Sequence, residues 1–496
     1  VGTARTKYTT EFAYDTENKP TTLTYGTGSL TYTWDKLSRI TKRRLKPGTT
    51  NIDTTYTYYA GGHGTGSTTN LVKTIVQDGV TLTYTYDNQS QLTKAVSSVN
   101  GTWNYQYDTY GNIRHQDHGN DEINYTYGDA NWLDLLTAVS GTKNGTSFSG
   151  SYVYDGAGNP TSFFNVGDLS TWTMTWKNGR ELATASNGTH SVSYDYDVNG
   201  LRTYKIVDGV RHDYVYASGQ LLRESFTLDG HSYVYDFLYD QSGRPYMLNY
   251  ISNGYSSRYY YVLNLQGDVM ALVTSEGVEV AKYTYDAWGN VTPDTTLWLS
   301  NRNPLRYRGY YYDTETGFYY LQSRYYDPAL GRFLNADSYA STGQGFLGYN
   351  MFAYCHNNPV LFSDWSGTKV YTSSWVDQTD SNTGSVYNMI LWLISQSLYC
   401  HPSSSTPLKT GEGKCNGIKY KYTAYASSNY NSNAIRTAVN VKLDGDNIIV
   451  KFDDLEPIEN QLRVYYKGFK IGKTIKIYPD KNYKNTYLKI RIKPRS

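Results

Sequence analysis

Tyr107-Asp108-Thr109-Tyr110-Gly111 is one of seven places in this chain where an aromatic residue is followed by Asp and then, three or four residues later, by Gly. The five cleanest copies carry Asp108, Asp155, Asp197, Asp240 and Asp286, and two copies stretched by one residue carry Asp313 and Asp327. Looser copies at Tyr14-Asp15, Trp34-Asp35 and Tyr86-Asp87 lack the Gly. A motif that recurs with a period of roughly 20 residues predicts a repeat architecture.

Each copy of the motif predicts a β-hairpin. The residues Ser191-Val192-Ser193-Tyr194-Asp195-Tyr196 alternate as in a half-buried strand, and a second strand is expected at 201–207. The Asp side chain can accept hydrogen bonds from N–H groups two or three residues later, and Gly supplies the positive φ that the turn needs. Because one hairpin is marginally stable in water, we expect residues 1–300 to form one continuous antiparallel sheet with almost no helix.

Composition supports an all-β chain and excludes several protein classes. Tyr accounts for 55 of the 496 residues, and it favours strands in which the ring packs on the sheet while the hydroxyl finds a partner. No run of about 18 apolar residues occurs, so no transmembrane segment is expected. Three Cys exclude a disulfide framework. The chain begins at Val1 without a signal peptide, so we expect a piece of a longer protein whose export signal lies elsewhere.

Charge divides the chain into two parts. Residues 1–367 hold 27 Lys and Arg against 34 Asp and Glu, whereas residues 368–496 hold 19 against 10. We therefore expect domains with different roles: a repeat array (1–300), a specialised end of the array (301–367) and a basic C-terminal domain (368–496). An acidic array would attract the basic domain, although salt screens such attraction over about 8–10 Å.

Residues 305–367 contain motifs of fixed spacing. They include Arg306-Tyr307-Arg308-Gly309-Tyr310, Gly331-Arg332-Phe333-Leu334-Asn335-Ala336-Asp337 and Asn357-Asn358-Pro359-Val360. This segment resembles the RHS repeat-associated core, and the upstream copies resemble the YD repeats of the same RHS/YD family. The resemblance implies a sheet that spirals into a hollow shell, here partial, with the core plugging one end. It also implies that a variable C-terminal domain, often a toxin, is held inside the shell.

The core of this family is also similar to an intramolecular aspartyl protease that releases the C-terminal domain. Carried over by motif, its two catalytic Asp residues match Asp337 and Asp364, and its cleavage site matches Gly367 and Thr368. Asp337 is followed by Ser338-Tyr339 where the family has Pro-x-Gly. The terminal element, Asp364-Trp365-Ser366-Gly367-Thr368, has Trp in place of Pro and Thr in place of the Leu after which the family cuts.

Two interpretations of the Asp pair stay open at this point. Two carboxylates that share a site cannot both ionise, so one could hold a proton while the other activates water. Alternatively, Asp337 and Asp364 cap turns, as the repeat Asp residues are expected to do. Arg324 and Arg332 could orient the carboxylates or form separate buried pairs. Neither interpretation calls for a cofactor or a metal.

The C-terminal domain is expected to be small and mainly β, with one helix at 385–400. A hairpin is predicted at 439–452 around Asp444-Gly445, and further strands at 462–466, 474–478 and 487–493. In the last strand Lys489, Arg491 and Lys493 share a face that either binds nucleic-acid phosphates or is simply solvated. Cys400 and Cys415 either close a disulfide or are free thiols.

Together these features predict a secreted or cell-surface bacterial protein. Its shell would enclose its own C-terminal domain as cargo and deliver it in competition between bacterial cells, with an immunity protein as a second partner. The alternative function is adhesion, in which the Tyr-rich shell binds proteins or glycans on a target cell and the C-terminal domain is harmless. Enzyme activity of the shell would be limited to self-cleavage.

Overall fold

The computed structural model describes residues 10–372, except 18, 26–27, 47–50, 61–67, 241–242 and 339–345, together with six strands between residues 409 and 494. The chain divides into two compact units, Val1–Ser374 and Trp375–Ser496. Every regular element in the described parts is a β-strand or a short 3-10 helix, so the all-β fold class is confirmed. None of the described helices has the length and hydrophobicity of a membrane span.

The first unit opens with a 13-stranded antiparallel sheet whose strands pair in chain order. The strands are β1 (Thr10–Tyr14), β2 (Pro20–Tyr25), β3 (Gly28–Trp34), β4 (Ile40–Lys46), β5 (Ile52–Ala60), β6 (Thr68–Gln77), β7 (Val80–Tyr86), β8 (Leu92–Ser97), β9 (Gly101–Tyr107), β10 (Ile113–His118), β11 (Asp121–Thr126), β12 (Ala138–Lys143) and β13 (Thr146–Ser151).

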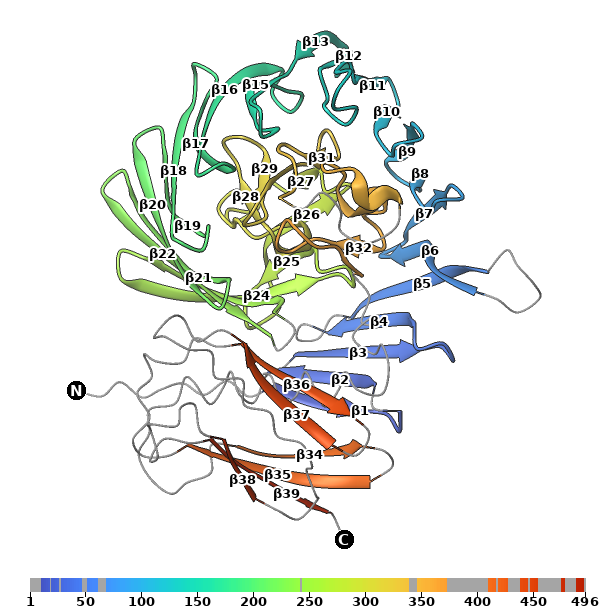
Figure 1. Ribbon diagram of the computed structural model, residues 1–496, viewed down its shortest axis with the longest axis vertical. Coiled ribbons are helices and arrows are strands. Elements are labelled where there is room, and N and C mark those ends of the chain that lie inside the picture. The colour runs from blue at the N-terminus through green and yellow to red at the C-terminus, as the bar shows by residue number, and fades with distance from the viewer. Residues whose placement is uncertain are drawn as a thin grey trace. The chain divides into compact units, whose positions relative to one another are not determined.

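A 14-stranded antiparallel sheet follows, again in chain order. Its strands are β14 (Val153–Tyr154), β15 (Pro160–Asn165), β16 (Ser170–Lys177), β17 (Glu181–Ser186), β18 (Ser191–Tyr196), β19 (Arg202–Val207), β20 (Val210–Ala217), β21 (Gln220–Leu228), β22 (His231–Tyr239), β23 (Pro245–Ser252), β24 (Tyr255–Leu263), β25 (Val269–Val273), β26 (Glu279–Tyr285) and β27 (Val291–Pro293). Figure 1 shows the strands of this unit curving around the segment that follows them.

The array is therefore two sheets and not the one continuous sheet that the repeats predict. At the break, the Tyr152 N–H donates to the Thr137 carbonyl at 3.0 Å and so extends the β12–β13 pairing by one residue, while β15 pairs with β14 on the other side of Tyr152. The backbone of Gly150 lies directly against the ring of Phe164, where an added Cβ would come within 2.0 Å of the ring. Close packing of β13 against β15 replaces edge-to-edge pairing here, and the absence of a side chain at Gly150 permits it.

An aromatic residue near the end of many array strands joins neighbouring hairpins, and in several copies it is the residue just before the repeat Asp. The strand register slips between Thr85 and Tyr86, and also between Leu238 and Tyr239, which is the signature of a β-bulge. Tyr86 then donates its hydroxyl to the Val72 carbonyl at 2.9 Å, one hairpin earlier. Equivalent bonds, spanning 14–18 residues, are made by Tyr58, Tyr107, Tyr127, Tyr196, Tyr239 and Tyr285, and by the indole N–H groups of Trp34 and Trp176.

The core segment follows the second sheet and is built from short elements. These are the 3-10 helices η1 (Tyr307–Gly309), η2 (Phe346–Tyr349) and η3 (Cys355–Asn357), the sheet β28 (Tyr311–Asp313), β29 (Phe318–Tyr320), β30 (Tyr325–Asp327) and β31 (Arg332–Phe333), and the pair β32 (Phe362–Ser363) and β33 (Tyr371–Thr372). Buried tyrosine rings fill its centre; Tyr326 and Tyr354, for example, stack with centroids 4.0 Å apart.

Carbonyl groups of the repeat-turn glycines attach this segment to the array. Asn357 Nδ2 donates to the Gly111 carbonyl at 2.6 Å, and the Tyr319 hydroxyl donates to the Gly289 carbonyl at 2.9 Å. Two further bonds run from the Ala336 N–H to Gly158 (3.2 Å) and from the Tyr320 hydroxyl to Gly200 (3.3 Å). Four of the five cleanest repeat turns thus contact the core directly.

The second unit is described only by its strands. They are β34 (Lys409–Cys415), β35 (Ile418–Ala426), β36 (Ala438–Asp444), β37 (Asn447–Asp453), β38 (Thr474–Ile477) and β39 (Leu488–Pro494). The hairpin β36–β37 and the strands β38 and β39 coincide with sequence expectations, whereas β34 and β35 were not predicted. The helix predicted at 385–400 and the strand predicted at 462–466 lie outside the described residues.

The bond between hairpins predicts a specific cost for losing one hydroxyl group. Tyr86→Phe leaves the carbonyl of Val72 without its partner and should lower the free energy of unfolding by about 1–2 kcal/mol. Equilibrium urea unfolding followed by circular dichroism measures this. Tyr110→Phe is the matched control, because the Tyr110 side chain is 48% exposed, and its effect should stay within about 0.5 kcal/mol. Equal effects of the two changes would contradict the assigned role of the bond.

Candidate functional site

The repeat Asp residues hold their own turns. Asp108 Oδ1 accepts the N–H groups of Tyr110 at 2.8 Å and Asn112 at 3.0 Å, and Gly111 completes the turn with a φ of 77°. The same carboxylate geometry recurs at Asp155, Asp197 and Asp286, and Asp240 Oδ1 accepts the Arg244 N–H. It is also present at Asp35 and Asp87, where Ser38 and Ser90 adopt the positive φ in place of Gly.

Asp313 departs from this geometry. Its turn closes through backbone bonds, and its carboxylate is directed at two cations of β19: Arg202 Nη1 at 2.7 Å and Lys205 Nζ at 2.8 Å. Arg202 is fully buried beneath four tyrosine rings, including that of Tyr320, whose centroid is 4.5 Å away. The expectation that the Asp313 carboxylate caps its own turn is therefore wrong, because a buried pair of cations binds it instead.

Asp327 caps its turn but is buried. Its Oδ1 accepts the N–H groups of Ala329 at 2.8 Å and Leu330 at 3.3 Å, and its Oδ2 has no hydrogen-bond partner in the structure. Burial raises the pKa of the Asp327 carboxyl to about 7, while the two backbone N–H groups oppose the rise. A carboxylate with one unpaired oxygen in the protein interior costs stability when it is ionised.

Asp337 and Asp364 meet at one buried arginine. Arg324 Nη2 is 2.9 Å from Asp337 Oδ2 and 3.3 Å from Asp364 Oδ2. The three residues are between 1% and 4% exposed. Asp337 follows β31, Asp364 follows β32 and Arg324 precedes β30, so three separate stretches of the core build the cluster.

The cluster holds the peptide bond between Gly367 and Thr368 at both ends. Arg324 Nε donates to the Gly367 carbonyl oxygen. On the other side of the bond, the Thr368 N–H donates to Asp364 Oδ1 at 3.2 Å, and the N–H of Lys369 does so at the same distance. A guanidinium group therefore lies on the carbonyl oxygen, and a carboxyl group lies on the nitrogen that would leave.

The backbone conformation of Gly367 is restricted by its neighbours. The Ser323 hydroxyl donates to the carbonyl oxygen of Ser366 at 2.7 Å. Gly367 has a φ of 71°, and an added Cβ would lie 2.7 Å from both the Ser323 hydroxyl and the Leu321 carbonyl oxygen. Only Gly combines this positive φ with the absence of a side chain, so the backbone on the N-terminal side of the Gly367–Thr368 peptide bond is fixed in position.

Opposing influences act on the protonation of Asp364. Burial raises the pKa of the Asp364 carboxyl and the nearby Asp337 carboxylate raises it further, whereas Arg324 and backbone N–H groups oppose the rise. Burial lowers the pKa of Arg324, while the two carboxylates oppose this change. A carboxyl group that retains its proton can protonate an amide nitrogen as the C–N bond breaks.

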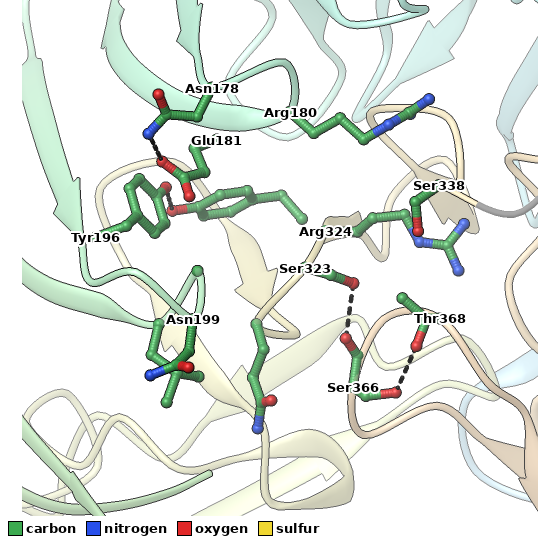
Figure 2. Close-up of a pocket in the computed structure, with 14 residues that line it drawn as sticks. Asn178, Arg180, Glu181, Tyr196, Asn199, Ser323, Arg324, Ser338, Ser366 and Thr368 are labelled. Atoms are coloured by element: carbon green, nitrogen blue, oxygen red, sulfur yellow. Dashed lines mark hydrogen bonds between the residues drawn. The ribbon is translucent and has the colours of Figure 1, made fainter. Parts of the chain in front are cut away.

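A cavity of about 310 Å³ opens beside this bond. Figure 2 shows its lining, with Ser338 lying between the guanidinium groups of Arg180 and Arg324 in this view. The array contributes residues that include Asn178, Arg180, Glu181, Tyr196 and Asn199, and the core contributes residues that include Ser323, Arg324, Ser338, Ser366 and Thr368. The cavity gives water a place next to the Gly367–Thr368 peptide bond.

The two arginines that the sequence analysis considered have separate roles. Arg324 joins the carboxylates, whereas Arg332 donates to the Tyr127 hydroxyl and to the Asp134 carbonyl, each at 2.7 Å. Three further residues of the site were not expected from the sequence. They are Tyr310, whose hydroxyl accepts the Asp364 N–H at 2.8 Å, together with Ser323 and Arg180. No spacing in the sequence links these residues to the Asp pair. In the segments that the structure describes, no group of His, Cys, Asp and Glu side chains could hold a metal ion.

The sequence is similar to those of several known proteins. A family model described as Teneurin YD-shell matches residues 65–360. The tRNA3(Ser)-specific nuclease WapA of Bacillus spizizenii is 34% identical over 310 residues, which are 62% of this chain and 12% of that protein. The double-stranded DNA deaminase toxin A of Burkholderia cenocepacia is 40% identical over 95 residues, 18% of this chain and 6% of that protein. This chain thus spans a small part of the length of these relatives.

Among solved structures, the complex TcdB2-TccC3-Cdc42 aligns with 73% of this chain and 22% of its own chain, at 16% identity and a TM-score of 0.46.

Burial of Asp327 predicts a pH-dependent contribution to stability. Because its pKa is raised in the folded state, the group favours folding below a pH of about 4, and this contribution is lost as pH rises through about 7. Asp327→Asn keeps the Oδ1 acceptor and removes the charge. Relative to wild type, the variant should therefore be roughly 2–4 kcal/mol more stable at pH 8 than at pH 5.

Urea unfolding of wild type and variant at the two pH values measures this difference. Asp229→Asn, at an exposed hairpin tip, is the control and should change stability equally at both pH values. An Asp327→Asn effect that does not vary with pH would show that the carboxyl is ionised in the folded state throughout this range, and would contradict the raised pKa.

Proposed function

The chain belongs to the Teneurin YD-shell family, and from this premise we propose that it is the carrier part of a secreted bacterial toxin that holds its C-terminal domain and frees it by cutting its own chain. The relatives support the first half of the proposal, because their names describe a tRNA nuclease and a DNA deaminase toxin. Competition between bacterial cells, with an immunity protein protecting the producer, is the setting that this proposal implies.

The observation that carries the second half is the way the Gly367–Thr368 peptide bond is held. Arg324 withdraws electron density from the Gly367 carbonyl, and the Asp364 carboxyl contacts the Thr368 nitrogen at 3.2 Å. Asp337 pairs with the same guanidinium. A turn cap needs only a carboxylate and nearby N–H groups; it does not need a second carboxylate and a cation on the carbonyl of the same peptide.

The reaction that we propose for these contacts is hydrolysis of the Gly367–Thr368 peptide bond. A water molecule adds to the Gly367 carbonyl carbon while Asp337 takes its proton, and Arg324 stabilises the negative charge that develops on the carbonyl oxygen. The Thr368 nitrogen becomes basic as the carbon turns tetrahedral, and Asp364 gives it a proton. The C–N bond then breaks, which leaves a carboxylate on Gly367 and an amine on Thr368.

We expect Thr368, which stands where the family has Leu, to lower the rate of self-cleavage without changing the reaction. Loss of a Leu side chain from an apolar pocket would cost about 1–3 kcal/mol of positioning energy, or roughly ten- to a hundredfold in rate. In this chain polar contacts hold the same stretch, since the hydroxyl groups of Ser366 and Thr368 bond to one another at 3.0 Å. We therefore expect slow but complete cutting.

Self-cleavage predicts a defined fragment. Purified wild-type chain should yield a product that begins at Thr368, or at Lys369 if the cut follows the residue that aligns with the family's Leu, detected by intact mass and N-terminal sequencing. Asp337→Asn and Asp364→Asn should stay whole. The rate should fall as pH rises, because the Asp364 acid loses its proton. Asp327→Asn, a buried core carboxylate outside the cluster, is the matched control and should still cut. A wild-type chain that stays whole after prolonged incubation would leave the Asp pair a structural role only.

The carrier role predicts that the C-terminal domain is harmful by itself. Expressing residues 368–496 in the bacterial cytoplasm should arrest growth, whereas residues 1–367 from the same promoter should not. The excess of 19 Lys and Arg over 10 Asp and Glu in this domain would suit a nucleic-acid target. Normal growth of cells that contain the soluble domain would favour the adhesion function instead.

A further inference from the structure

Ala336, the residue before Asp337, is held on both sides by the repeat array. Its N–H donates to the Gly158 carbonyl at 3.2 Å, and its carbonyl oxygen accepts a hydrogen bond from Arg180 Nη1. Gly158 lies in the turn between β14 and β15, and Arg180 immediately precedes β17. Ala336 itself has no exposed surface. The backbone that carries Asp337 is therefore positioned by two hairpin turns of the array.

Asp364 is positioned differently. Its N–H donates to the Tyr310 hydroxyl, and its carboxylate pairs with Arg324; both partners belong to the core. Its neighbours Thr368 and Lys369 donate to its Oδ1. Asp337 also has core contacts, since its N–H donates to the Met351 carbonyl at 2.9 Å and its carboxylate pairs with Arg324. It differs from Asp364 in that the residue before it is bonded to two turns of the array.

We propose that Arg180 is a positioning residue for self-cleavage, through which the array sets Asp337 and makes cutting conditional on docking of the array turns onto the core. This inference rests on the proposed self-cleavage. It adds a control step to that reaction: in a chain whose array has not closed on the core, Asp337 keeps its core contacts but lacks the two array contacts that hold Ala336 beside it. Its C-terminal domain stays attached until the carrier is assembled.

The chemistry of the contact gives Arg180 a larger effect than an ordinary packing residue. A guanidinium donating to a carbonyl forms a charge-assisted hydrogen bond, and this carbonyl is buried with Ala336. Without it, only the weaker N–H contact to Gly158 fixes the peptide ahead of Asp337 on the array side. A displacement of about 1 Å at a reacting group can cost on the order of a hundredfold in rate.

The cavity makes a direct chemical test available. Arg180 lines it together with Arg324, Ser338 and Thr368. Truncation of Arg180 to Ala enlarges the cavity by the volume of the lost side chain. A free guanidinium ion can then occupy the vacated place and donate to the same carbonyl of Ala336.

The experiment follows full-length chains made by cell-free synthesis, with a labelled pulse and an unlabelled chase that gives the rate constant of cutting. Arg180→Ala should slow cutting by about ten- to a hundredfold. Guanidinium chloride at millimolar concentration in the chase should restore much of the rate, whereas sodium chloride should not. The control is Arg223→Ala, another array arginine, which is 51% exposed and pairs with Asp236 at 2.6 Å; it should cut at the wild-type rate.

A second pair of variants tests the other contact to Ala336. At Gly158 (φ 78°) an added Cβ would lie 2.7 Å from the Trp132 ring and 3.0 Å from Ala336 Cβ, so Gly158→Ala should displace both neighbours and slow cutting. Gly79 has nearly the same φ, 77°, with nothing within 4 Å of an added Cβ. Gly79→Ala therefore carries the same backbone strain without the contact, and should leave the rate unchanged.

The outcomes separate this inference from the proposed function. If wild type stays whole, self-cleavage is wrong and the role of Arg180 falls with it. If wild type is cut and Arg180→Ala is cut equally fast, only the inference is overturned. Slow cutting that guanidinium does not restore would show a general folding defect and would also overturn it. In the uncut Asp364→Asn background, Arg180→Ala should speed hydrogen exchange in the peptide covering residues 334–338, and unchanged exchange would contradict the positioning role.

Discussion

The carboxylate of an array repeat Asp, accepting two N–H groups of its own turn at Asp108, Asp155, Asp197 and Asp286, is the interaction on which the rest of the structure depends. At Asp155 it holds the turn that contains Gly158, whose carbonyl accepts the Ala336 N–H of the core. The core uses such carbonyls as attachment points. One of these attachments leads to Ala336 and so to Asp337. A turn in the array thereby helps to position a residue of the proposed cleavage site in the core.

The second constraint is the need for a hydrogen-bond donor at the aromatic position of each repeat. The bulge before the Asp places a ring over the previous hairpin, and the donor at the tip of the ring meets a backbone carbonyl there. Tyr supplies this donor in most copies, and Trp34 and Trp176 supply it through the indole N–H. Phe has no donor at that place, which gives a physical reason for 55 Tyr against 13 Phe.

Local features of this fold could be predicted from the sequence, and contacts between distant residues could not. The hairpins and the turn role of Asp108 follow from alternation and from an Asp–Gly spacing, both of which act over a few residues. The break in the sheet at Tyr152 could not be predicted, because strands of the same pattern lie on both sides of it. The partners of Asp313 belong to β19, and neither Arg202 nor Lys205 has a spacing that points to them.

The candidate site shows the same division. Asp337 and Asp364 were found only through a resemblance in motif, and Arg324 was one of two equal candidates until their contacts separated them. Ser323 and Tyr310 act through a single hydroxyl each, and Arg180 acts on a carbonyl 156 residues away. Side chains that bond to backbone atoms leave no pairing pattern, because any residue can supply the carbonyl or the N–H.

The bonds between hairpins each reach back by one repeat only, so these bonds by themselves do not set how many hairpins the array contains. The core does set this number, because it must meet Gly111, Gly158, Gly200 and Gly289 at the same time. The core therefore fixes the number of hairpins between those turns. An extra hairpin there would preserve every bond between neighbouring hairpins, but the turns after it would no longer meet their partners in the core.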